Sequence, residues 1–94
     1  MEKKPLHPEV EDFVRSLRNL EAILSTHQSE FWSARVCKVR QIAEKSDGYS
    51  VEMFLGFFGG MGSFSDVVLD APKPVNDAFD AERRRAYRLA QTLK

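Results

Sequence analysis

The feature that most constrains the fold is a long amphipathic stripe near the start of the chain. Between positions 10 and 24, six apolar residues recur mainly at intervals of three and four, the spacing that places side chains on one face of an α-helix. They are Val10, Phe13, Val14, Leu17, Leu20 and Leu24. Pro8 suits the first turn of such a helix, and the acidic residues that follow it are favourable near a helix N-terminus. The pattern predicts a helix over residues 8–26 whose apolar face must be covered.

Three later segments are also predicted to be helical. Apolar residues at helical spacing indicate a second helix from about residue 30 to 45, a short third helix that ends near Phe58, and a last helix over about 75–93. Ser29 is a suitable N-cap for the second helix, and Asn76 for the last.

Together these segments predict an all-α fold. We expect a small four-helix domain over residues 1–94, with a Gly-rich loop and a short irregular segment between the third and fourth helices. The composition is 43% hydrophobic over 94 residues, which is sufficient for one core. Trp32 begins the inward stripe of the second helix, so it is expected to pack against the first or the last helix.

The Gly-rich loop contains three of the five glycines of the chain. They are Gly59, Gly60 and Gly62, and Ser63 directly follows the last of them. Gly59 suits a left-handed C-cap of the third helix, and the two glycines around Met61 predict a turn with a positive φ. Phosphate-binding loops normally follow a strand and contain a lysine, whereas this loop follows a helix and lacks one. We therefore expect the glycines to be there because the backbone turn requires them. The alternative is that the loop binds a ligand.

Charge and cysteine content limit the classes of partner and compartment. The formal net charge is zero, but residues 46–82 carry seven acids and one lysine, whereas residues 83–94 carry five basic residues and no acid. Long-range attraction to nucleic acid or to a membrane is therefore not expected. A single cysteine, Cys37, and the absence of a long apolar run favour a reducing cytoplasm and argue against a membrane span.

Residues with catalytic or metal-binding potential are scattered. His7 and His27 lack a second ligand at metal spacing, and Cys37 has no neighbouring histidine to activate it, so it is predicted to be an inert thiol. The basic run 83–85 cannot form one stripe, because successive helical residues point about 100° apart. Glu82 falls on the inward stripe of the last helix, where we expect it to pair with an arginine. No enzyme, metal or cofactor is predicted.

The helical stripes cannot cover every apolar residue near the Gly-rich loop. Either the surplus side chains form core beneath the loop, or they form an apolar patch that a partner covers. For the second case we expect Met61 and Phe64 to act as anchors, with acidic residues on the rim. The expected rim residues are Asp66, Asp70 and Asp77.

The loop region also carries a resemblance to a known family. The run Phe58-Gly-Gly-Met-Gly-Ser-Phe-Ser-Asp-Val-Val-Leu69, preceded by Trp32 and followed by Asn76, resembles a family of small bacterial helical proteins of unknown function. They share a Phe-Gly-Gly-Met-Gly-Ser-Phe-x-Asp motif, in which the position of Ser65 is often Asn. The similarity spans most of residues 31–90. It implies a compact helical bacterial domain and no established activity.

The sequence favours a non-enzymatic, protein-binding module of a bacterial cytoplasm. An immunity or antitoxin-like protein that neutralises a partner is the specific hypothesis. One alternative is a small ligand-binding protein or enzyme that uses Ser63, Asp66 and the loop 59–66. A second alternative is a structural homodimer in which the surplus Phe and Met side chains form the interface.

Overall fold

The computed structural model contains four α-helices and one 3-10 turn in the part of the chain that it describes. That part comprises residues 8–27, 29–45, 48–58 and 63–94. The elements are α1 (Pro8–Thr26), α2 (Glu30–Glu44), α3 (Tyr49–Leu55), the 3-10 turn η1 (Phe64–Asp66) and α4 (Lys73–Leu93). None of these residues forms a strand, which confirms the all-α prediction.

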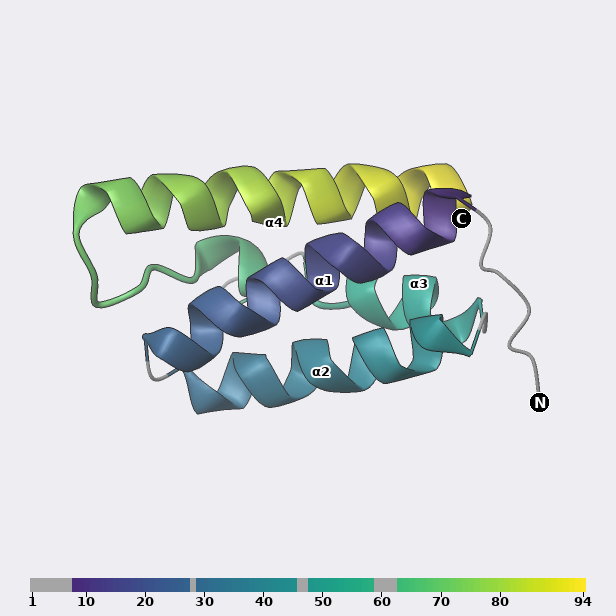
Figure 1. The fold of residues 1–94 in the computed structure, drawn as a ribbon, viewed down its shortest axis with the longest axis horizontal. Helices are drawn as coiled ribbons and strands as arrows, with labels where there is room; N and C mark the ends of the chain where they lie inside the picture. The colour runs from purple at the N-terminus through teal and green to yellow at the C-terminus, as the bar shows by residue number, and fades with distance from the viewer. Residues whose placement is uncertain (1–7, 28, 46–47, 59–62) are drawn as a thin grey trace.

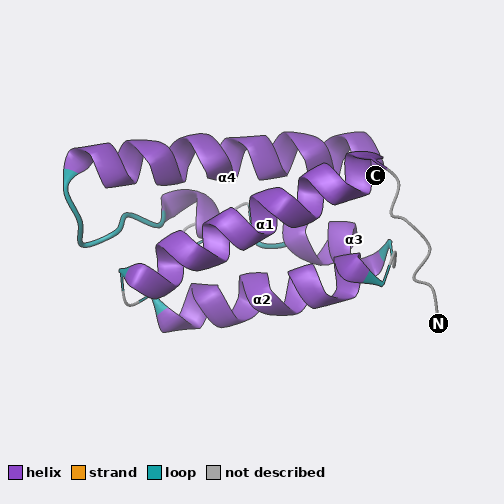
Figure 2. Cartoon of the chain, viewed as in Figure 1, coloured by secondary structure: helices purple, strands orange, loops and turns teal. Residues whose placement is uncertain are grey.

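The helices enclose one core. In Figure 1, α1 runs diagonally between α4 and α2, and it packs against both of them. The short helix α3 packs against α2 and α4, and Figure 2 shows the irregular segment that leads from η1 to α4. The apolar stripe of α1 supplies much of the core: Phe13, Leu17, Leu20 and Leu24 are fully buried. The described helices include none that is both long and apolar enough to cross a membrane.

The ends of the helices only partly follow the prediction. The bounds of α1 coincide with it, and α2 begins directly after Ser29, although the Ser29 side chain makes no capping hydrogen bond. The third helix is shorter than expected, because it ends at Leu55 with Gly56 at the C-cap in a right-handed conformation. Gly59, the predicted left-handed cap, lies outside the described residues.

Asn76 is not the N-cap of the last helix, because α4 begins three residues earlier, at Lys73. Its side-chain amide instead holds the segment before the helix. Asn76 Oδ1 accepts a hydrogen bond from the Leu69 N–H (2.8 Å), and Nδ2 donates to the carbonyl oxygens of Leu69 and Ala71, each at 3.0 Å. One amide therefore satisfies three backbone groups of the irregular segment.

We predict that Asn76→Ala lowers the free energy of unfolding by about 2 kcal/mol, because three backbone groups lose their partner in a half-buried place. Urea denaturation would measure the loss. Gln91→Ala, at an exposed position on the same helix, is the control and should change little. Equal stability of the two variants would contradict the role assigned to Asn76.

The least expected feature of the fold is a buried arginine. Arg83 is only 9% exposed. Its Nη1 donates to the carbonyl oxygens of Phe64 (2.8 Å) and Val67 (3.0 Å), and its Nη2 donates to Asp80 Oδ1 at 2.9 Å. The guanidinium carbon also lies 4.7 Å from the centre of the Phe79 ring. Arg83 thus fastens the turn η1 and the residue after it to α4.

We predict that Arg83→Met costs about 3 kcal/mol of stability. Methionine keeps an apolar stem of similar length, but the two backbone carbonyl groups lose a charged donor and stay buried. Equilibrium unfolding in urea would measure this loss. Arg85→Met removes a similar charge from an exposed position on α4 and should be nearly neutral. If the unfolding curves of Arg83→Met and Arg85→Met were superimposable, Arg83 would not be what holds η1 and Val67 against α4.

Candidate functional site

For Phe64 the sequence offers two alternatives, core beneath the Gly-rich loop or an exposed anchor, and the structure places it in the core, 0% exposed. Its N–H donates to the Phe57 carbonyl oxygen at 2.8 Å, which folds the chain back against the end of α3. Its ring then lies 4.8 Å from that of Trp32 and 5.8 Å from that of Phe79, measured between ring centres. The prediction of a surface role for Phe64 is therefore wrong, because the 3-10 turn points this side chain inward.

Of the remaining residues of the predicted partner surface, the structure describes the side chains of Asp70 and Asp77. Asp70 and Asp77 are exposed, and Asp77 pairs with Lys73 at 2.9 Å. Met61 and the side chain of Asp66 lie outside the described residues, as do Gly59, Gly60 and Gly62, including the predicted positive φ.

Ser63 is described, and it occupies the N-cap position of η1. Its hydroxyl makes no capping hydrogen bond to the backbone. The Ser63 Oγ instead lies 2.6 Å from the Ser65 Oγ.

The structure places a different apolar residue at the surface. Phe31, on the first turn of α2, is 59% exposed. The guanidinium carbon of Arg35 lies 3.8 Å from the centre of its ring, which is a close cation–π contact. Arg35 also borders a surface hollow of about 340 Å³ between α2 and the end of α3. We call Phe31 and the lining of this hollow the α2–α3 face: Phe31, Ala34, Arg35, Lys38, Met53 and Phe57.

The α2–α3 face rests on aromatic side chains that continue into the core. The Trp32 ring lies 5.3 Å from that of Phe31 and 5.6 Å from that of Phe57, in edge-to-face contacts. Trp32 also contacts the buried Phe64, so its contacts with other aromatic rings are on α2, after α3 and in η1, and it packs against the core cluster. The predicted packing of Trp32 against the first or last helix stays a prediction. The exposed ring of Phe31 is therefore held on a packed base.

The charge of the α2–α3 face is positive. Arg35 and Lys38 have no acidic partner within the described ranges of the chain. This differs from the acidic rim predicted near the loop. The signal for Phe31 was present in the sequence: it is a large apolar residue off the inward stripe of a helix that has few apolar residues.

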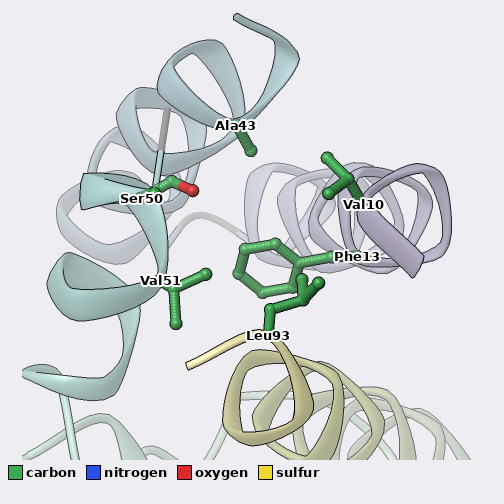
Figure 3. Close-up of a pocket in the computed structure, with 7 residues that line it drawn as sticks. Val10, Phe13, Ala43, Ser50, Val51 and Leu93 are labelled. Atoms are coloured by element: carbon green, nitrogen blue, oxygen red, sulfur yellow. The ribbon is translucent and has the colours of Figure 1, made fainter. Parts of the chain in front are cut away.

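A second hollow lies at the end of the bundle, where all four helices meet. Figure 3 shows the side chains of Val10, Phe13, Val51 and Leu93 around it, with Ser50 as a polar neighbour. Its volume is about 90 Å³, well below the roughly 300 Å³ of the smallest typical ligand sites. We interpret it as a gap in the packing between helix ends.

Glu82 joins α1 to α4, but not through an arginine. The Ser16 hydroxyl donates to Glu82 Oε2 at 3.0 Å, and the Asn19 amide donates to Oε1. The expected Glu82–Arg pair is therefore wrong. These two neutral donors on α1 satisfy both oxygens of a carboxylate on the inward side of α4.

An ionic network joins α1 to α2 around Arg40. Its guanidinium contacts the carboxylates of Glu21 and Glu44, and Glu44 also accepts a hydrogen bond from Arg18 at 3.0 Å. The hydrogen bond from Arg40 and, to a smaller extent, that from Arg18 hold the pKa of Glu44 below its usual value.

The pKa of the neighbouring Cys37 thiol is shifted in the opposite direction. Its hydrogen bond with Glu21 is the largest cause and burial the next, and both raise the pKa of the thiol. This supports the prediction of an inert thiol.

We predict that Cys37 reacts with iodoacetamide at higher pH than a free thiol, because only the thiolate attacks and a thiolate beside Glu21 is disfavoured. Glu21→Gln should lower the pKa of Cys37 and shift the pH–rate curve down. Glu11→Gln, on an exposed part of the same helix, is the control. Identical curves for the two variants would show that Glu21 does not set the thiol pKa.

The geometry described so far defines a small α-helical domain without a metal-ligand cluster among its described residues. Residues 25–74 match the sequence model of the family described as Domain of unknown function (DUF6966). The match covers more than half of the 94 residues, and the chain belongs to this family. This agrees with the resemblance to a domain of unknown function; the bacterial origin and the shared motif stay predictions. No curated protein and no solved structure matches the chain.

Proposed function

We propose that this protein is a non-enzymatic protein-binding module and that the α2–α3 face is its binding surface. The observation that carries the proposal is the exposed ring of Phe31, 59% accessible, with Arg35 stacked on it and a 340 Å³ hollow beside it. Aromatic residues and arginines contribute most often to the affinity of protein interfaces. A ring held on a packed aromatic base also loses little conformational freedom on binding.

The chemistry of the face suggests the chemistry of the partner. Met53 and Phe57 give the hollow an apolar wall, and Arg35 and Lys38 place two positive charges at its border. A partner that inserts an apolar side chain and flanks it with carboxylates would match both features. The flanking charges would mainly increase the association rate, while the buried side chain would slow dissociation.

Two further observations are compatible with a binding role. All six residues of the α2–α3 face fall within residues 25–74, the range that matches the family. Arg83, which is 9% exposed, and the inward Glu82 are engaged in tertiary hydrogen bonds, which favours structural roles for both. As a more specific hypothesis, the protein is a cytoplasmic immunity or antitoxin-like neutraliser of a bacterial partner.

We predict that Phe31→Ser weakens partner binding about 30-fold, corresponding to about 2 kcal/mol for the loss of an aromatic anchor. The tagged protein would first capture partners from cells of its source organism, and the dissociation constant of a purified partner would then be measured by calorimetry. Val68→Ser is the matched control, because Val68 is 80% exposed and lies outside the α2–α3 face.

The outcome separates the proposal from its alternatives. Loss of one captured protein with Phe31→Ser, and retention with Val68→Ser, would support the α2–α3 face. Equal capture by both variants would place the interface elsewhere. Light scattering over a range of protein concentrations tests the homodimer alternative: a dimer that Phe31→Ser dissociates would make the partner a second copy of this chain.

A further inference from the structure

A third surface hollow lies between α4 and the segments that flank the Gly-rich loop. Its volume is about 390 Å³, within the range of small-molecule sites. Arg83, Arg84 and Arg88 line it from α4, together with Asp80. The sequence separates these arginines from the loop region by about 20 residues, and the fold brings them next to Ser65.

The charges in this hollow do not cancel. Asp80 is shared between two arginines, with Oδ1 at 2.9 Å from Arg83 Nη2 and Oδ2 at 3.1 Å from Arg84 Nη2. Arg88 has no acidic partner in the described part of the chain. Three arginines against one aspartate leave a formal charge of +2 in the hollow. A phosphate monoester carries about −1.5 to −2 at neutral pH and is the closest match in charge.

One wall of the hollow is aromatic. The rings of Phe58 and Tyr87 lie 4.7 Å apart, and both border the hollow. The Tyr87 hydroxyl accepts a hydrogen bond from Gln91 Nε2 at 3.1 Å, so its own proton is available to donate. The exposed Ser65 hydroxyl also borders the hollow, and its oxygen lies 2.6 Å from the Ser63 Oγ. Guanidinium groups, hydroxyl groups and aromatic rings therefore converge on one space.

We infer that this hollow binds the phosphate group of a small aromatic molecule. Arg84 and Arg88 hold the phosphate oxygens, since guanidinium groups pair with phosphate through charge-assisted hydrogen bonds. The rings of Phe58 and Tyr87 contact the organic part. This site is separate from the α2–α3 face, and the inference does not depend on the proposed protein-binding function.

Phenyl phosphate is a suitable probe because it joins a dianionic phosphate to one aromatic ring. Titration of the full chain at pH 7.5 and constant ionic strength, followed by ¹H–¹⁵N NMR, would give its dissociation constant. Inorganic phosphate and benzoate are the comparison ligands, the first without a ring and the second with a single negative charge. We expect phenyl phosphate to bind about tenfold more tightly than either.

Two variants at exposed positions of α4 locate the site. Arg88→Gln removes an exposed cation of the hollow and should weaken phenyl phosphate binding about tenfold, as expected for the loss of a charged hydrogen bond. Arg85→Gln removes an exposed arginine that does not line the hollow and should leave the affinity unchanged. Equal effects of the two variants, equal binding of benzoate or inorganic phosphate, or no binding of phenyl phosphate would each overturn the inference.

Discussion

The structure depends on the hydrogen bonds that Arg83 makes to the backbone of η1 and of the residue after it. Two carbonyl oxygens of this segment, from Phe64 and Val67, point at one guanidinium on α4. Because the segment is fixed there, the Phe64 ring enters the core and contacts Trp32. Trp32 in turn supports Phe31 at the surface. A buried cation on the last helix is thus connected, through three aromatic rings, to the face that we propose binds a partner.

Polar side chains also fix the relative positions of the helices, which apolar stripes alone do not specify well. Glu82 bonds to Ser16 and Asn19 and so ties α4 to α1, while the network around Arg40 ties α2 to α1. Burying a polar group is costly unless it is hydrogen-bonded, so a slipped register would leave such groups unpaired. We therefore regard these contacts as determinants of register, whereas the apolar core supplies most of the favourable free energy.

The sequence was sufficient for the fold class and for α1, because a continuous stripe with suitable end residues has one interpretation. It was insufficient where contacts between distant segments determine the role of a side chain. Asn76 has the properties of an N-cap, yet its amide is used by Leu69 and Ala71, and the helix begins earlier. For Phe64 the sequence leaves two places open, core beneath the Gly-rich loop or an exposed anchor, because helical periodicity does not predict the inward direction of a side chain on a 3-10 turn. The exposure of Phe31 is only weakly indicated by the sequence, because it is a single apolar residue beside Trp32.

The distribution of ion pairs explains how a chain with no net charge presents positive surfaces. Several acids are used within the fold: Glu21 and Glu44 contact Arg40, and Asp80 lies between two arginines. Three of the cations that border the hollows of about 340 and 390 Å³, Arg35, Lys38 and Arg88, have no acidic partner among the described residues. At physiological salt, charges more than about 8 Å apart in solvent are largely screened, so a ligand responds to the nearest charges and not to the molecular total. For a protein of this size, the formal net charge is therefore a poor guide to the sign of its partners.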